Sequence, residues 1–174
     1  MALPVVDETA IADRVRALGH QISQEYAGKS PIIIGVLNAC VTFLADLTRA
    51  ISIPCEFDFI AVSRLAENRS VRFEKDTSAS VEGRHVLLID DMIDTGLTLE
   101  YVIKTLSARN PASVAVCTLL TRPKRRLAAI DVAYSGFDVP NSFLVGYGLD
   151  YHGLFRELPA LYAHGSWPLG VGTT

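Results

Sequence analysis

The sequence predicts an α/β fold in which helices cover both faces of a doubly wound, mainly parallel central sheet. Apolar runs at residues 32–37, 86–89 and 114–120 are typical of strands that are buried on both faces. Segments with helical spacing of apolar residues lie between these runs, as the crossovers of a parallel sheet require. Because ligands bind beyond the carboxyl ends of such strands, we expect a binding site at that edge.

The first predicted element is a helix that covers the sheet. Asp7 is a suitable N-cap, because its carboxylate can accept hydrogen bonds from the first turn. The helix is expected to end before Gly28, which precedes Lys-Ser-Pro. Its inward face consists of apolar residues at helical spacing, namely Ile11, Val15, Leu18 and Ile22.

The next predicted elements are a strand at residues 32–37, a helix at 41–51 and a strand at 57–62 that ends near Ser63. Residues 64–84 then lose all periodicity and predict a mobile lid loop or a weak hairpin. Long loops in compact domains are usually functional, and this one leaves the sheet at the edge of the expected site. The alternative is a disordered surface insertion without a role.

The central stretch of the chain combines a strand, a loop and a helix. The apolar run at 86–89 ends at Asp90 and Asp91, and apolar residues recur at helical spacing from Leu99. The loop between them, residues 94–98, reads Asp-Thr-Gly-Leu-Thr. A helix N-terminus, two threonine hydroxyls and a glycine favour an anion site that fits a phosphate monoester. The paired acids indicate vicinal hydroxyls or a metal as further ligands.

The last third of the chain contains a strand at 114–120, with Arg122 at its carboxyl end. The basic run continues through residues 124–126, Lys-Arg-Arg, which we expect to form a solvated face. Short strands are predicted at 132–136 and 143–146.

Length and composition favour one globular domain, residues 1–174, with 166–174 as a loose C-terminal tail. A net charge of −3 does not provide the excess of positive charge that binding to nucleic-acid phosphates needs. No segment is apolar for the roughly 20 residues that a membrane helix needs, and the N-terminus lacks the features of a signal peptide. We therefore expect a cytoplasmic protein without a membrane partner. The 3 cysteines and 4 histidines lack the spacing of disulfide or metal sites.

Two acids, two hydrophobic residues and Asp-Thr-Gly-x-Thr after an apolar strand resemble the phosphoribosyl pyrophosphate motif of type I phosphoribosyltransferases. Further segments resemble bacterial hypoxanthine-guanine phosphoribosyltransferases, at residues 26–29, 36–37, 45–47, 82–86 and 145–151. The resemblance reaches about Pro159. It implies the type I fold, with a small hood from the terminal segments. It also implies purine salvage, in which phosphoribosyl pyrophosphate and hypoxanthine or guanine give IMP or GMP and pyrophosphate.

The resemblance implies a role for each residue of the central motif. Asp90 and Asp91 would hold the ribose hydroxyls and Mg²⁺, and Asp150 would be a further metal ligand, with a structural cap as its alternative. Asp94 would be the general acid/base at N7 of the purine. The 5′-phosphate would be held by Thr95, Gly96, Leu97 and Thr98.

Other parts of the chain are implied to bind pyrophosphate and the base. Leu37, Asn38 and Arg156 would lie on the pyrophosphate side. Base binding would use Arg122, stacking by Phe143 and the backbone of Leu144, with core packing as the alternative for the last two. The resemblance also implies a homo-oligomer, a dimer or a tetramer.

The chain departs from the family's pattern at three places that touch substrate. Asn38 and Ala39 replace Lys-Gly, Arg64 replaces a tyrosine at the start of the lid, and Arg122 replaces a lysine that reads the purine's 6-oxygen. These changes leave two alternatives open. One is a sensor that binds a nucleotide or phosphoribosyl pyrophosphate without turnover, and the other is a transferase for another base.

Overall fold

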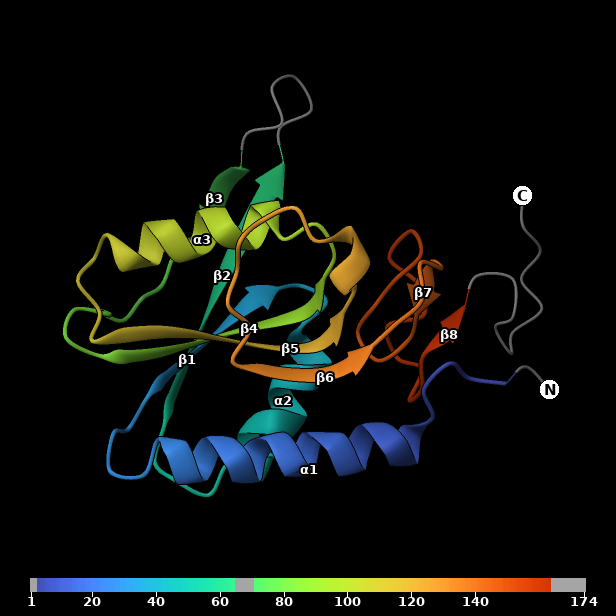
Figure 1. Cartoon of the computed structure of the whole chain (residues 1–174), viewed down its shortest axis with the longest axis horizontal. Helices are drawn as coiled ribbons and strands as arrows, with labels where there is room; N and C mark the ends of the chain where they lie inside the picture. Colours follow the sequence, from blue (N-terminus) through green and yellow to red (C-terminus); the bar gives the residue numbers. More distant parts are fainter. Residues whose placement is uncertain (1–2, 65–70, 164–174) are drawn as a thin grey trace.

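A six-stranded sheet forms the centre of the computed structural model, which describes residues 3–64 and 71–163 apart from the side chain of Arg64. Its order is β3-β2-β1-β4-β5-β6 (Figure 1). Neighbouring strands are parallel except β2 and β3, which are antiparallel. The strands are β1 (Ile32–Leu37), β2 (Glu56–Arg64), β3 (Val71–Lys75), β4 (His85–Ile93), β5 (Ser113–Thr121) and β6 (Tyr134–Asp138).

Helices cover both faces of this sheet. On one face lie α1 (Glu8–Glu25) and α2 (Val41–Ala50), and on the other lies α3 (Leu97–Ser107) (Figure 1). Asp7 caps α1 as predicted, because its carboxylate accepts a hydrogen bond of 2.8 Å from the backbone N–H of Ala10. The doubly wound, mainly parallel architecture predicted from the apolar runs is therefore confirmed.

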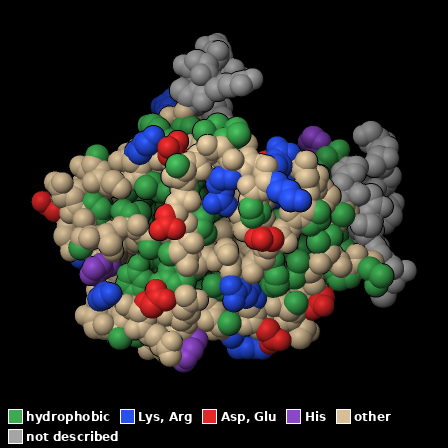
Figure 2. Space-filling model, in the orientation of Figure 1, with side chains coloured by type: hydrophobic (Ala, Val, Ile, Leu, Met, Phe, Trp, Pro, Cys, Tyr) green, Lys and Arg blue, Asp and Glu red, His purple; other side chains and the backbone are tan. Residues whose placement is uncertain are grey.

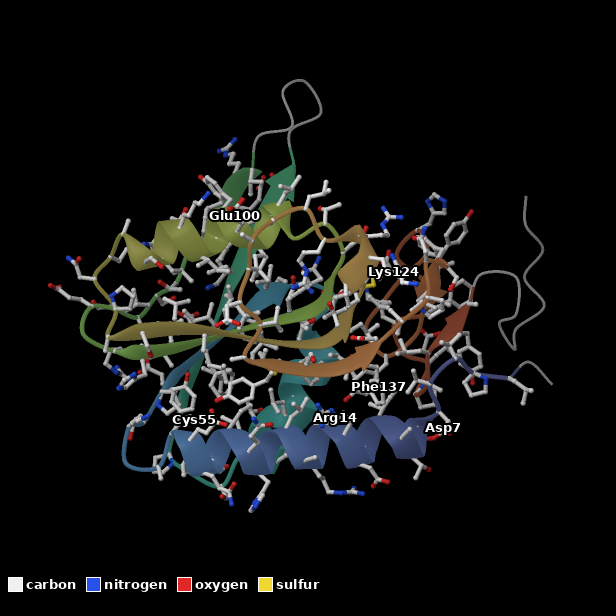
Figure 3. The ribbon with its side chains drawn as sticks, in the orientation of Figure 1. Asp7, Arg14, Cys55, Glu100, Lys124 and Phe137 are labelled. Atoms are coloured by element: carbon white, nitrogen blue, oxygen red, sulfur yellow. The ribbon has the colours of Figure 1, made fainter. Side chains whose placement is uncertain are left out.

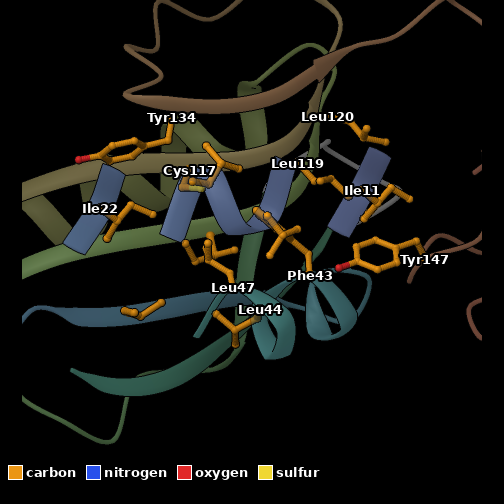
Figure 4. Close-up of a cluster of buried hydrophobic side chains, with 14 of the residues drawn as sticks. Ile11, Ile22, Phe43, Leu44, Leu47, Cys117, Leu119, Leu120, Tyr134 and Tyr147 are labelled. Atoms are coloured by element: carbon orange, nitrogen blue, oxygen red, sulfur yellow. The ribbon is translucent and has the colours of Figure 1, made fainter. Parts of the chain in front are cut away.

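The core consists of two layers, because successive side chains of a strand point to opposite faces. Ile33 and Leu87 pack on the α1 and α2 side. Phe43 of α2 belongs to the same cluster (Figure 4). Ile34 and Leu88 pack on the α3 side. Each of these side chains is fully buried. Burial of a side chain of this size contributes about 1.5 to 3 kcal/mol to stability.

β4 extends further than the apolar run predicts. Its pairing with β5 continues through Asp90 opposite Thr118 to Ile93 opposite Thr121. Asp90 and Asp91 therefore belong to the strand instead of following it, because backbone pairing with β5 satisfies the chain beyond the last apolar residue. The loop that follows is correspondingly short, and α3 begins at Leu97.

The described part of residues 64–84 forms a hairpin. β3 pairs antiparallel with β2, and the register shifts between Ala61 and Val62. This arrangement confirms the hairpin alternative for residues 71–75. Residues 65–70 of the predicted lid lie outside the described residues, and the lid role stays a prediction.

Asp58 of β2 anchors the chain that follows the hairpin. Its carboxylate accepts hydrogen bonds from the backbone N–H groups of Ser78 and Ala79, at 2.5 and 3.2 Å. Lys75 at the end of β3 pairs with the same carboxylate at 3.2 Å. The base of the hairpin is thus fixed to the sheet.

A small hood forms from the terminal segments, as expected. β7 (Leu144–Val145) pairs antiparallel with β8 (Tyr162–Ala163). The N-terminal segment joins them, because the N–H of Val5 donates to the carbonyl of Leu161 at 2.7 Å. The predicted tail, residues 166–174, lies outside the described residues.

Charges of both signs are interspersed on the face shown in Figure 2. Among the described residues, no helix is long and apolar enough to cross a membrane. The three cysteines are free, and Cys40 and Cys117 are buried.

Candidate active site

A cavity of about 530 Å³ lies at the carboxyl edge of the sheet, beside β4 and β5. Many of the predicted site residues line it, namely Asp91, Asp94, Arg122, Phe143, Leu144 and Asp150. The lining also includes Ala39 from the loop after β1, and Arg125 and Asn141. The topology therefore brings segments that are distant in sequence to the edge at which open α/β sheets bind ligands.

Two adjacent acids of β4 lie at this edge. Burial, followed by the charge of Asp91, raises the pKa of Asp90 well above its ordinary range. Burial also raises the pKa of Asp91, although a hydrogen bond with Asp90 and the charge of Arg156 act against it. Neighbouring carboxylates of this kind are suited to hydroxyl donors or a cation, because either offsets their desolvation and mutual repulsion.

The loop that follows β4 leads into the N-terminus of α3. Gly96 is the N-cap with a φ of 81°, a conformation that glycine adopts without strain. A Cβ at this position would lie 2.9 Å from Cδ1 of Ile130. Leu97 and Thr98 form the first turn, and no side chain of the described residues caps the helix. The positive end of the helix dipole is therefore available to an anion.

Thr95 is held in place by the segment that follows β5. Its carbonyl oxygen accepts hydrogen bonds from the N–H groups of Leu127 and Ala128, at 3.0 and 3.1 Å. A phosphate at the start of α3 would therefore meet a preformed backbone.

The loop after β1 approaches the hood closely. The peptide bond between Leu37 and Asn38 is cis, and Asn38 is exposed. Gly148 has a φ of 98°, and a Cβ on it would lie 2.1 Å from the carbonyl oxygen of Ala39. Only glycine permits this approach, which fixes the loop beside the cavity.

Arg156 connects the hood to the cavity. Its guanidinium donates to the carbonyl of Gly148 at 2.7 Å and pairs with Oδ1 of Asp150 at 2.8 Å. Oδ2 of Asp150 accepts a hydrogen bond of 2.7 Å from the N–H of Gly153. Asp150 thus has the contacts of a structural cap, the alternative left open above, and it also lines the cavity.

Arg122 is buried and has several partners. Its Nε donates to the carbonyl of Pro140 at 3.1 Å, and Nη2 donates to the carbonyl of Ser142. Its Nη1 lies 3.8 Å from Oδ1 of Asp94. The guanidinium therefore supports the segment before Phe143 and faces Asp94 with its remaining nitrogen.

Lys124 and Arg125 are exposed, as predicted for a solvated face, but Arg125 also contacts the site. Its Nε lies 2.7 Å from Oδ1 of Asp94, and Nη1 donates to Oδ1 of Asn141 at 2.6 Å. Arg126 is also engaged, because its guanidinium donates to the hydroxyl of Thr121. Pro123 begins a 3₁₀ turn after β5, which directs this part of the basic run toward the site.

Phe143 and Leu144 differ in exposure. Phe143 is 51% exposed, and its ring packs edge to face with Tyr151 at a centroid distance of 5.9 Å. A half-exposed ring on the cavity can stack on a base, whereas core packing accounts for the buried side chain of Leu144.

Comparison with known proteins identifies the family. The phosphoribosyl transferase domain family matches residues 5–152. The chain belongs to this family. The hypoxanthine-guanine phosphoribosyltransferase of Mycobacterium avium is 44% identical over 158 residues, covering 85% of this chain and 78% of that protein. That of Streptococcus pneumoniae is 38% identical over 159 residues, covering 89% of this chain and 88% of that protein.

Solved structures agree. A hypoxanthine phosphoribosyltransferase from Staphylococcus aureus matches with a TM-score of 0.89 and 34% identity, covering 92% of this chain and 90% of that one. A hypoxanthine-guanine phosphoribosyltransferase from Bacillus anthracis matches with a TM-score of 0.90 and 32% identity, covering 94% of this chain and 98% of that one. The resemblance and the type I phosphoribosyltransferase fold predicted from the sequence are therefore confirmed.

The acids of this phosphoribosyltransferase suit a metal that substrate helps to hold. Within residues 3–64 and 71–163, no group of three or more His, Cys, Asp or Glu side chains could hold a metal ion. Mg²⁺ usually binds one or two carboxylates together with substrate phosphates and water. The hard oxygen donors of Asp90 and Asp91 fit that requirement.

Sequence reasoning missed Arg125 and Asn141. Pro123 signals a turn directly after Arg122, but the sequence does not show that this turn is a 3₁₀ helix that directs Arg125 toward the site. Asn141 carried no comparable signal, since its contact depends on the fold of the segment before β7.

Proposed function

We propose that this protein transfers the 5-phosphoribosyl group of phosphoribosyl pyrophosphate to hypoxanthine or guanine, giving IMP or GMP and pyrophosphate. The observation that carries the proposal is the cavity in which Asp91, Asp94 and the half-exposed Phe143 meet, at the end of the strand that leads into α3. The names of the relatives support the choice of substrates.

The ribose and its 5′-phosphate would bind along the loop after β4. Asp90 and Asp91 accept hydrogen bonds from the ribose hydroxyls, which offsets the cost of placing two carboxylates together. Backbone N–H groups and threonine hydroxyls of residues 95–98 hold the phosphate, aided by the helix dipole. The sugar is thereby oriented for displacement at its anomeric carbon.

Charge develops on both partners as pyrophosphate leaves. The carboxylates of β4 stabilise the oxocarbenium-like ribose, and Arg156, with the loop of Leu37 and Asn38, lies on the pyrophosphate side. Mg²⁺, when bound, neutralises charge on the leaving group, and Asp90 and Asp91, with Asp150 as a further ligand, would hold it.

The purine would occupy the cavity between Phe143 and Asp94. Phe143 stacks on the base, and the backbone of Leu144 hydrogen-bonds its exocyclic groups. Asp94 accepts the proton of N7. Nη1 of Arg122, the nitrogen without a backbone partner, donates to the 6-oxo group.

One observation favours a second candidate function, a sensor that binds phosphoribosyl pyrophosphate without turnover. The exposed Asn38 stands where the family commonly has a lysine that faces pyrophosphate. A sensor that binds phosphoribosyl pyrophosphate needs the phosphate loop but no group for proton transfer, so the presence of Asp94 in the cavity favours the enzyme. The homo-oligomer and the cytoplasmic location stay predictions.

The test is an assay with Mg²⁺, phosphoribosyl pyrophosphate and each of hypoxanthine, guanine, xanthine and adenine. We expect a nucleoside monophosphate and pyrophosphate in equal amounts from hypoxanthine or guanine. Adenine should give none, because its 6-amino group is a donor and would face the donor of Arg122, whereas a 6-oxo group accepts from it. Binding without release of pyrophosphate for every base would contradict the enzyme and support the sensor.

A further inference from the structure

We propose that Arg125 is a positioning residue for Asp94. Its guanidinium holds one oxygen of the carboxylate so that the other oxygen faces the purine. The inference rests on the proposed function, in which Asp94 exchanges a proton with N7 of the base.

The guanidinium of Arg125 is fixed at two points. Nε lies 2.7 Å from Oδ1 of Asp94, and Nη1 donates to Oδ1 of Asn141 at 2.6 Å. The contact of Nε is an ion pair, since Oδ1 of Asp94 has no hydrogen-bond partner among the described residues, and the contact of Nη1 is a hydrogen bond. Because the group is planar, the two contacts together limit its orientation. Arg125 therefore spans the cavity from the end of β4 to the segment before β7.

Arg122 does not provide the same support. Two of its nitrogens donate to backbone carbonyls, and Nη1 is 3.8 Å from Oδ1 of Asp94, beyond the distance of a hydrogen bond. Arg125 is thus the cation that contacts Asp94 directly.

The contacts of Asp94 are divided between its two oxygens. Both cations approach Oδ1, and within the described residues no hydrogen bond or ion pair engages Oδ2. Asp94 also lines the cavity. A carboxylate held at Oδ1 keeps its other oxygen directed at one place, whereas a carboxylate without that contact samples several rotamers.

The exposure of the pair indicates what this contact can do. The side chains of Arg125 and Asp94 are 43% and 32% exposed, so solvent screens much of their attraction. Orientation of the carboxylate is accordingly the main effect that we assign to Arg125. Loss of the contact should lower the turnover number and leave binding of phosphoribosyl pyrophosphate unchanged.

Lys124 is a matched control. It belongs to the same 3₁₀ turn, is exposed, and carries the same charge (Figure 3). A Lys124→Ala variant removes one positive charge from the turn without touching the contacts of Asp94. It therefore separates a general electrostatic effect from the specific one.

The experiment compares kcat and KM with hypoxanthine and phosphoribosyl pyrophosphate for wild type, Arg125→Ala, Arg125→Lys, Lys124→Ala, Asp94→Asn and the Arg125→Ala/Asp94→Asn double variant. Thermal midpoints of all six proteins report folding. We expect Arg125→Ala to lower kcat about tenfold at an unchanged KM for phosphoribosyl pyrophosphate. Arg125→Lys should recover part of the loss, and Lys124→Ala should stay close to wild type.

The double variant gives the decisive comparison. If Arg125 acts through Asp94, the Arg125→Ala change should cost little further kcat once Asp94 is asparagine, because residues that act as a unit are not additive. Equal losses in both backgrounds, or a wild-type kcat for Arg125→Ala, would overturn the inference alone. Absence of turnover in the wild-type protein would instead overturn the proposed function, and this inference with it.

Discussion

Arg122 supports two backbone carbonyls and faces Asp94, so its replacement should affect both stability and catalysis. We predict that Arg122→Ala destabilises the protein by about 1 to 3 kcal/mol, since carbonyl groups lose their donor. The variant should also lose about tenfold or more in kcat/KM for hypoxanthine and guanine, the size of a hydrogen bond from a charged group. Urea unfolding and steady-state kinetics measure the two effects. Unaltered kinetics in a destabilised variant would place Arg122 outside base recognition.

Replacement of Asp90 and Asp91 should weaken substrate binding without lowering stability. Because burial raises the pKa of both groups, ionising them costs stability at neutral pH. We predict that the Asp90→Asn/Asp91→Asn variant is at least as resistant to urea as wild type at pH 7, yet binds phosphoribosyl pyrophosphate and Mg²⁺ more weakly. Calorimetry measures the binding. Wild-type affinity would show that this pair does not hold the ribose or the metal.

Residue types alone indicated the acids, the phosphate loop and Arg122, because each follows an apolar strand at the carboxyl edge. The same pattern could not show that Arg125 reaches Asp94 while Lys124 stays exposed. The direction of a side chain after Pro123 depends on the 3₁₀ turn, and a basic run of three residues does not reveal it.

At the scale of elements, the hairpin of β2 and β3 is the candidate lid. We predict that amide hydrogen exchange in β3 slows when phosphoribosyl pyrophosphate, Mg²⁺ and a base analogue are all bound, because closure must exclude water from the reacting carbon. β6, at the other edge of the sheet, is the internal reference. Equal exchange in β3 with and without ligands would remove the hairpin from the mechanism.

Asp58 makes the base of this hairpin sensitive to acid. Burial acts to raise its pKa, but hydrogen bonds from Phe59, Ser78, Ala79 and Lys75 outweigh it and hold the pKa below its ordinary value. A lowered pKa in the folded state contributes stability above the ordinary pKa and loses it as the pH falls through the folded value.

We therefore predict that the free energy of unfolding falls less steeply below about pH 4 in Asp58→Asn than in wild type. Urea unfolding between pH 6 and the acid limit, at about half-unit steps, measures the slopes. Asp131→Asn, at an exposed aspartate, is the matched control. The same slope in all three proteins would show that Asp58 does not supply this acid sensitivity.

Apolar runs predicted the buried strands well, because a central parallel strand has no polar face. They placed the end of β4 too early, since Asp90 and Asp91 are polar residues within the strand, where Asp90 pairs with Thr118 of β5. The hairpin was one of two alternatives for residues 64–84, because an edge strand with one solvated face has a weak pattern.

At the scale of the whole molecule, the topology explains why one cavity collects the site. Parallel strands deliver their following loops to the same edge, and the hood adds residues from the last quarter of the chain. The sequence predicted this edge but could not show how Gly148 brings the hood against Ala39, since that contact joins distant segments. The predicted oligomer stays untested, and sedimentation velocity measures it.

Phosphoribosyl transfer depends most directly on Asp94 as its acid/base. The measurement is single-turnover formation of IMP from hypoxanthine with wild type and Asp94→Asn, each saturated with phosphoribosyl pyrophosphate and Mg²⁺. We predict a loss of about 10²-fold or more in rate, the usual scale for a positioned acid/base, with unchanged affinity for phosphoribosyl pyrophosphate. An Asp94→Asn protein that forms IMP at the wild-type rate would contradict the account.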